Sequence, residues 1–102
     1  MTEATRKPET ARLFDALGAD LAAGMPVLRS LRKIEEELSG SSIAEIINMM
    51  ATDIGNGATL SEAIEKHPDT FDEAAVLLVR SGEASGMLDR IMPILAEYML
   101  IC

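Results

Sequence analysis

Few residues of this chain belong to the types that catalyse reactions or bind metal ions. His67 is the only histidine among 102 residues, and Cys102 at the last position is the only cysteine. Because there is no second histidine and no second cysteine, the sequence offers no material for a nucleophilic dyad or a zinc site. His67 stands before Pro68 at a predicted helix end, where a positive charge suits the helix dipole. We therefore interpret it as structural.

Carboxylates are plentiful, and they are interpreted as a solvated acidic face. Acid–base catalysis needs two carboxylates in different environments, and nothing around Asp72 and Glu73 or residues 35–37 indicates such a difference. Residues 53–64 fail as a calcium loop, because Gly55 and Gly57 replace oxygen ligands and the twelfth residue is Ile64. We predict no catalytic residue, no cofactor and no metal site, and a looser divalent-cation site has no support.

The composition favours one small helical domain with an aliphatic core. Hydrophobic residues make up 48% of the chain, aromatic residues only 3%, and tryptophan is absent. Leucine, isoleucine, alanine and methionine supply the apolar material, and the long unbranched side chains among them favour helix over sheet. We expect an all-α fold, with residues 1–8 as a flexible N-terminal segment and residues 9–102 as a single domain.

The charge argues against nucleic acid as a partner. The net charge is −8, and residues 41–102 hold ten acidic residues against three basic ones. The only basic cluster is the short group Arg29, Arg32 and Lys33, too small to attract a phosphate backbone. The first residues lack the apolar core of a secretion signal, and no run reaches the length of a membrane span. We expect a soluble chain without a membrane span, compatible with a reducing compartment.

Apolar residues at helical spacing predict six helices with short connections. The expected helices cover about residues 9–23, 26–38, 42–55, 60–66, 71–80 and 88–99. Short connections place consecutive helices side by side, so we predict a compact six-helix bundle built from antiparallel helical hairpins. Pro93 lies inside the last helix and should bend it, because its nitrogen cannot donate to the carbonyl of Asp89.

Turn and cap residues mark the ends of these helices. Gly24 ends the first helix, Pro26 suits the first position of the second, and Gly57 belongs to the close of the third. Capping boxes are predicted at residues 42–45 and at residues 59–62, where a serine or threonine is followed three positions later by glutamate.

The stretch of residues 82–89 predicts a tight turn between the last two helices. We expect Gly82 to end the fifth helix in the left-handed conformation, and Ser85 or Gly86 to cap the sixth. Asp89 then falls in the first turn of the sixth helix, where its negative charge suits the dipole.

Two apolar stretches could contact another protein. Residues 74–79 are all apolar and surround the helix, which predicts either central burial or a face covered by another chain. Residues 98–102 are also apolar, and they too are either buried or covered by another chain. They lie at a chain end, where deep burial is uncommon. The candidate contact residues are Leu78, Leu100 and Ile101.

Three blocks of sequence resemble the cytoplasmic domain of the type II secretion F proteins, the family that includes the type IV pilus platform protein. Residues 82–89, Gly-Glu-Ala-Ser-Gly-Met-Leu-Asp, resemble its closing signature. Residues 14–31 resemble its leading motif, an apolar helix followed by Ala-Gly-x-Pro and Leu-Leu-x-x-Leu. Residues 56–64 resemble its Gly-x-Ser-Leu-Ser-Glu-Ala-Leu segment, and residues 67–71 resemble its His-Pro-x-x-Phe segment. The blocks occur in the family's order and cover about residues 13–98.

The resemblance implies a non-catalytic bundle of six helices that faces the cytoplasm at the inner membrane and forms a homodimer. The implied partners are a hexameric secretion or pilus assembly ATPase and inner-membrane assembly components, between which the platform passes motion. The matching residues are turn and cap positions, which implies an architectural role for Gly24, Pro26, Gly57, Gly82, Glu83 and Gly86. A stand-alone soluble adaptor or regulator derived from the same domain is the alternative.

The chain also departs from the family pattern. Family members usually carry two such domains with membrane helices, whereas this sequence predicts one domain and no span. Asp72 stands where proline is common, and Pro93 stands where a regular helix usually continues. We expect the last helix to dock differently for these reasons.

Overall fold

A computed structural model of the protein describes residues 8–101, and within them the chain forms α-helices and no strands. The helices are α1 (Glu9–Ala22), α2 (Val27–Glu37), α3 (Ile43–Gly55), α4 (Leu60–Glu65), α5 (Glu73–Ser85) and α6 (Leu88–Ile101). The predicted all-α fold of six helices is confirmed. Residues 1–7 of the predicted flexible segment, and Cys102, lie outside the described residues, whereas Pro8 forms the N-cap of α1.

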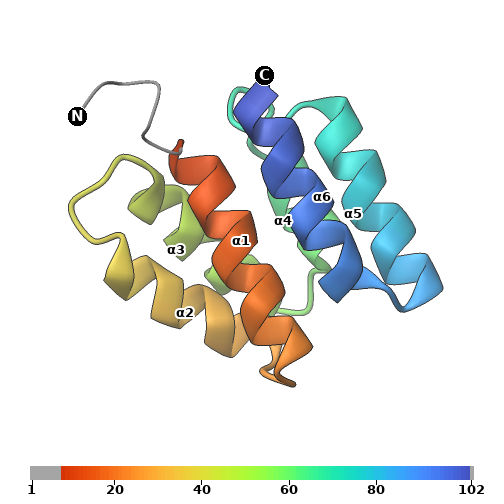
Figure 1. Ribbon diagram of the computed structural model, residues 1–102. Coiled ribbons are helices and arrows are strands. Elements are labelled where there is room, and N and C mark those ends of the chain that lie inside the picture. The colour runs from red at the N-terminus through yellow and green to blue at the C-terminus, as the bar shows by residue number, and fades with distance from the viewer. Residues whose placement is uncertain (1–7, 102) are drawn as a thin grey trace.

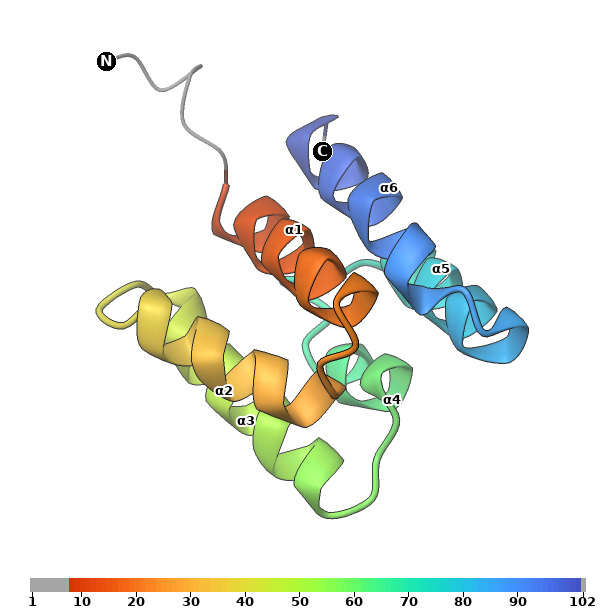
Figure 2. The ribbon, with the colours of Figure 1, turned by 60° about the horizontal axis from the view of Figure 1, so that its bottom comes forward.

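The helices are arranged around α1. Figure 1 shows α1, α6 and α5 side by side, and Figure 2 shows α1 between the α2–α3 pair and the α5–α6 pair. The most extensive packing joins α1 to α6, which are the first and last helices in the chain. The α2–α3 pair and the α5–α6 pair therefore pack on opposite sides of α1.

The core is aliphatic with one aromatic pair at its centre. Phe14 of α1 meets Phe71, which precedes α5, edge to face with ring centroids 5.6 Å apart. The largest fully buried aliphatic side chains around this pair are Leu13, Leu17, Leu31, Ile34, Ile47, Met50, Ile64, Met92, Leu95 and Val79. These residues come from all six helices, so burial of one shared core holds the bundle together.

Three helices end on a glycine in the left-handed region. Gly24 after α1, Gly57 after α3 and Gly86 after α5 have φ angles of 91°, 109° and 72°. At the end of α5 the backbone N–H of Met87 donates to the carbonyl of Gly82 at 2.9 Å, which satisfies one of the last helical carbonyls. The sequence analysis correctly predicted that Gly24 and Gly57 lie at helix ends.

The prediction for Gly82 is wrong, and so is the predicted end of the fifth helix at Arg80. Helix α5 continues to Ser85 and Gly86 is its left-handed cap, so neither Ser85 nor Gly86 opens α6. Gly82 is buried inside α5 against α6, where an added Cβ would lie 2.9 Å from Cγ1 of Ile91 and 3.1 Å from Cα of Leu88. Its missing side chain lets the two helices approach, and Asp89 falls in the first turn of α6 as expected.

The two predicted capping boxes have different outcomes. At the start of α4 the box forms: Thr59 Oγ1 accepts the backbone N–H of Glu62, and the Glu62 carboxylate accepts the backbone N–H of Thr59. At the start of α3 it does not form, because Ser42 has helical angles and its side chain caps no N–H. Instead, Oε1 of Glu9 in α1 accepts the backbone N–H of Ile43 and the hydroxyl of Ser42.

Helix α6 runs through Pro93, which is exposed but has one edge of its ring beside α1. Gly18 of α1 is the opposing residue: a Cβ added there would lie 2.8 Å from Cβ of Met92 and 3.4 Å from Cδ of Pro93. The proline ring is thus accommodated beside a residue without a side chain. None of the helices in residues 8–101 has both the length and the apolarity needed to cross a bilayer.

Candidate functional site

Glu83, in the middle of the predicted turn motif, reaches from α5 to the start of α4. Its Oε2 accepts the backbone N–H of Ser61 at 3.0 Å, and its Oε1 accepts the Ser61 hydroxyl at 2.6 Å. Ser61 is buried in the first turn of α4, where backbone N–H groups lack helical partners. A carboxylate at this position also suits the positive end of the helix. Glu83 is therefore a cap supplied by another helix.

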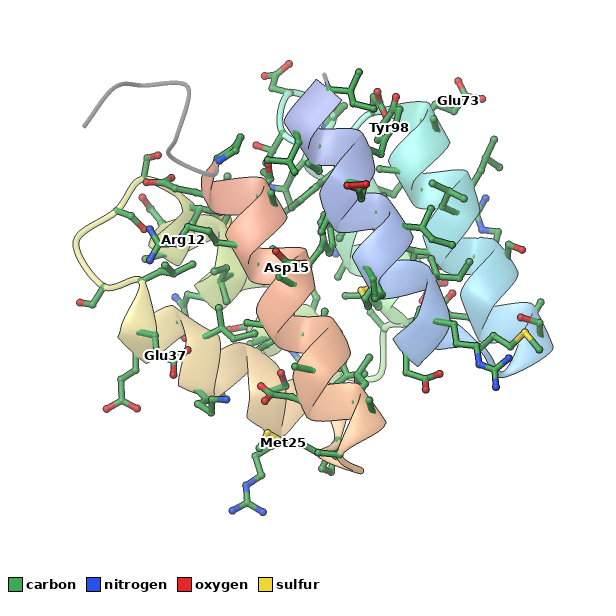
Figure 3. The ribbon with its side chains drawn as sticks, viewed as in Figure 1. Arg12, Asp15, Met25, Glu37, Glu73 and Tyr98 are labelled. Atoms are coloured by element: carbon green, nitrogen blue, oxygen red, sulfur yellow. The ribbon has the colours of Figure 1, made fainter. Side chains whose placement is uncertain are left out.

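Asp72 caps α5 and also holds the far end of α6. Its Oδ1 accepts the backbone N–H of Ala75 at 3.0 Å, and its Oδ2 accepts the hydroxyl of Tyr98 at 2.6 Å. The Tyr98 hydrogen bond, followed by the backbone donors, lowers the pKa of Asp72 below its ordinary value. Figure 3 shows Tyr98 of α6 and Glu73 of α5 at the same end of the hairpin. The departure at Asp72 thus adds a link between these helices.

A third polar link joins α1 to α2 through Asp20. This carboxylate accepts the Ser30 hydroxyl at 2.7 Å and lies 2.8 Å and 3.0 Å from Nζ of Lys33. The hydrogen bond to Lys33 is the main cause that lowers the pKa of Asp20, and the same contact raises the pKa of Lys33. Asp20 and Ser30 are both buried, so each satisfies the other's need for a hydrogen-bond partner.

His67 lies in the turn between α4 and α5. Its backbone carbonyl accepts the N–H groups of Thr70 and Phe71, so the residue helps to build that turn. Its Nε2 is buried and has no hydrogen-bond partner among residues 8–101. In the same part of the chain, no three acidic, histidine or cysteine side chains gather closely enough to hold a metal ion. The backbone of His67 is therefore part of the turn between α4 and α5.

The predicted contact residues differ in exposure. Leu78 is half-buried against the core, whereas Leu100 is 46% and Ile101 is 84% exposed. Leu77, which the sequence analysis did not single out, is 53% exposed on the outer side of α5. The apolar run at residues 74–79 is therefore divided: Ala75, Val76 and Val79 are buried, and Leu77 faces outward.

The structure brings two of the motif blocks together. Residues 57–64 contact residues 82–89 through the link between Ser61 and Glu83. The glycine motif at residues 23–26 forms the turn between the end of α1 and the start of α2. Pro26 lies one position earlier than predicted, as the N-cap of α2, and its carbonyl accepts the N–H of Ser30. These residues form joints between helices.

Sequence reasoning missed two residues that position the helices. Gly18 falls on the apolar stripe of α1, and an isolated glycine on such a stripe is a signal of close packing. Asp20 gave a weaker signal, because an acidic residue on a helix is common. Its partner, Lys33, is thirteen positions away and lies in another helix. Its partner could not be chosen without the tertiary structure.

The sequence profile of one protein family matches residues 13–100, a range that includes residues of all six helices. The family is described as "Type II secretion system (T2SS), protein F". The match begins in the first half of α1 and ends one residue before the end of α6.

Similar proteins include components of pilus assembly and of secretion. The type IV pilus assembly protein TapC of Aeromonas hydrophila is 37% identical over 78 residues, which are 76% of this chain and 19% of TapC. PilC of Thermus thermophilus is 37% identical over 83 residues, 81% of this chain and 20% of PilC. The type II secretion system protein F of Vibrio cholerae is 31% identical over 91 residues, 89% of this chain and 22% of that protein. The chain thus spans about a fifth of the length of these curated relatives.

Proposed function

The chain belongs to the type II secretion system protein F family, and on that premise we propose that it is a non-catalytic interaction domain of a secretion or pilus assembly platform. In this role it couples an assembly ATPase to inner-membrane components of the machine. We place the domain at the cytoplasmic face of the inner membrane. The observation that carries the proposal is the family match over residues 13–100, which extends from α1 to α6.

The geometry of three carboxylates supports a role in transmitting contacts. Glu83, Asp72 and Asp20 each join two helices, and the carboxylates of Glu83 and Asp72 also cap helix N-termini. A bundle whose helices are tied at several joints moves as one body, which suits a part that passes motion between partners. These three links, of which only Glu83 belongs to a family motif, thus serve the rigidity of the scaffold, while binding depends on its surface.

The exposed apolar residues near the end of α6 are the proposed contact for the assembly partners. Leu100 and Ile101 lie at the last turn of the helix and leave apolar surface open to solvent. Exposed apolar patches of this kind are typical of interaction sites. Glu97, one turn earlier, adds a negative charge near them.

A binding experiment tests the proposal. The purified chain is immobilised, and the assembly ATPase of the same organism is titrated over it with the binding followed by interferometry. We expect saturable binding that Leu100→Asp weakens and that Met49→Asp, an equally polar change at an exposed residue of α3, leaves unchanged. Absence of binding to both the ATPase and the inner-membrane assembly components would contradict the proposal and favour a stand-alone adaptor. Equal weakening by both variants would refute the contact assigned to Leu100.

The proposal includes self-association of the chain as a homodimer. Sizing by light scattering at several concentrations tests this part, and a mass that stays monomeric throughout would contradict it. Leu78→Asp tests whether the half-buried residue of α5 contributes to the dimer contact.

A further inference from the structure

A groove lies beside the first two turns of α5, beyond the end of the short helix α4. Helix α4 has six residues and α5 has thirteen, so α4 covers only part of the α5 face on which it packs. Ser61 in the first turn of α4 meets Glu83 near the end of α5, and Glu65 at the end of α4 meets Arg80. After Glu65 the chain turns back toward the start of α5, and the space between this turn and α5 is the α4–α5 groove.

The α4–α5 groove has an apolar lining. Phe71 and Val76 are buried at its floor. Pro68 borders it in the turn, and Leu77 is 53% exposed at its edge. Buried apolar side chains beside an exposed leucine leave a surface that an apolar side chain of a partner can cover.

The size of the groove indicates what fits it. The groove encloses about 280 Å³, slightly below the range of about 300–1,000 Å³ that is typical of small-molecule pockets. Contacts between proteins are commonly anchored by a few large side chains that fill pockets on the partner. The α4–α5 groove therefore suits one side chain of a protein segment better than a free small molecule.

The surface around the groove is acidic. Residues 62–73 hold five acidic residues, all exposed, and one basic residue. The basic residue, Lys66, is turned to Asp53 of α3, with which it forms an ion pair at 3.2 Å. Glu73 takes part in none of the ion pairs among residues 8–101, and Figure 3 shows it pointing outward at the start of α5. The charge next to the apolar lining is therefore complementary to a basic partner.

We propose that the α4–α5 groove binds a basic segment of another protein, with one apolar side chain of the segment against Leu77 and a neighbouring lysine or arginine beside Glu73. Glu73 and Leu77 are four residues apart in α5, so they lie on the same side of the helix. A second copy of this chain is disfavoured as the occupant, because both copies carry a net charge of −8. The inference adds a binding surface to the proposed function and does not use the contact assigned to Leu100 and Ile101.

The ion pair at the other end of the groove offers a second acidic contact. Arg80 and Glu65 are 3.5 Å apart, and both side chains are at least half exposed. Exposed pairs of this kind contribute little to stability, so Glu65 can accept a basic residue of a bound segment at small cost. Glu65 and Glu73 then give the segment an acidic contact on either side of its apolar anchor.

Binding of a synthetic peptide tests the inference. The probe is the capped peptide Ser-Lys-Arg-Leu-Phe-Lys-Arg-Ser, titrated into isotope-labelled protein while NMR records the amide chemical shifts. We expect saturable shifts centred on residues 65–80, with a dissociation constant of about 1 mM or tighter. Two control peptides replace either the four basic residues by glutamate or the two apolar residues by serine. Each should bind at least about tenfold more weakly, because each lacks one of the two complementary features.

Variants of the protein locate the contact, and each has a matched control in α3. Leu77→Gln removes the apolar edge and should weaken peptide binding about tenfold, whereas Met49→Gln, at another exposed residue, should leave it unchanged. Glu73→Gln should weaken binding about two- to fivefold. Glu45→Gln, which removes an exposed carboxylate from the first turn of α3, should have no effect. Circular dichroism checks that every variant is folded.

Several results would overturn the inference. They are the absence of binding at about 1 mM peptide, an acidic peptide that binds as tightly as the basic one, shifts centred outside residues 65–80, and control variants that weaken binding as much as Leu77→Gln. Shifts of residues 65–80 that appear on concentrating the protein without peptide would identify a second copy as the occupant instead. Because the assay contains no ATPase, its failure would leave the proposed function standing, and failure of the ATPase titration would leave this inference standing.

Discussion

Gly18→Ala tests the claim that the packing of α1 on α6 depends on a missing side chain. The new Cβ would lie 2.8 Å from Cβ of Met92 and 3.4 Å from Cδ of Pro93. Carbon atoms are most stable at about 3.5–4.0 Å, so α1 and α6 must separate by about 1 Å. Neither neighbour can rotate away, because Met92 Cβ is fixed to the backbone and Pro93 is a ring.

The expected loss of stability follows from two opposing effects. Inserting a methyl group into a packed core costs about 1–3 kcal/mol. Because Met92 Cβ and the Pro93 ring cannot move aside, we expect the cost for Gly18→Ala to be near the upper end of this range. Alanine in the middle of a helix recovers about 1 kcal/mol relative to glycine. We therefore expect the free energy of unfolding to fall by about 2 kcal/mol, which corresponds to a Tm about 10 °C lower for a domain of this size.

Urea unfolding followed by circular dichroism measures the change, and Gly55→Ala is the matched control. Gly55 also lies in a helix, but a Cβ there would meet only Cδ2 of Leu28 at an ordinary 3.8 Å. Without a clash, this variant should be more stable than the unaltered chain by up to about 1 kcal/mol. A Gly18→Ala protein as stable as the unaltered chain would refute the reasoning.

Three polar links yield further predictions. Glu83→Ala should lower the free energy of unfolding by about 1–2 kcal/mol, because Ser61 loses its cap, and Glu83→Gln should lose less since it keeps an acceptor. Equal stability of all three proteins in urea would show that the cap contributes nothing. Tyr98→Phe should raise the pKa of Asp72 toward its ordinary value, which NMR titration of the carboxyl carbon measures; an unchanged pKa would contradict the assigned cause. Because the pKa of Asp20 is lowered in the folded chain, its stabilising contribution is present above about pH 4 and is lost as pH falls through the folded pKa. The stability difference between the unaltered chain and Asp20→Asn should therefore shrink at low pH, and a difference that stays constant from about pH 7 to 3 would be inconsistent with this.

Local signals in the sequence were sufficient for the helices and for several of their ends. Apolar periodicity gave the six helices, Gly24 and Gly57 marked two ends, and residues 59–62 formed the predicted capping box. Each of these features depends on residues within a few positions of one another. The helical conformation and its caps are decided at that range, so the sequence alone indicates them.

Errors arose where two local solutions competed. Gly82 and Gly86 could each end α5, and the sequence analysis chose Gly82. The structure uses Gly86 as the cap because Gly82 is needed inside the helix, where Leu88 and Ile91 approach too closely for a side chain. Similarly, Ser42 could have capped α3, but Glu9, which lies more than thirty positions earlier, caps it. Packing between distant segments decided both cases.

The amino-acid sequence thus determined which segments become helices and which face of each is apolar. Only the tertiary structure decided which faces meet: α1 packs most extensively on α6, and Glu83 reaches Ser61. It also decided which apolar residues remain outside, so that Ile94 is exposed and Val79 is buried. The physical reason is that the hydrophobic effect is non-directional: it requires an apolar face to be covered without specifying its partner. The choice of partner depends on shape and on polar links between residues far apart in the chain.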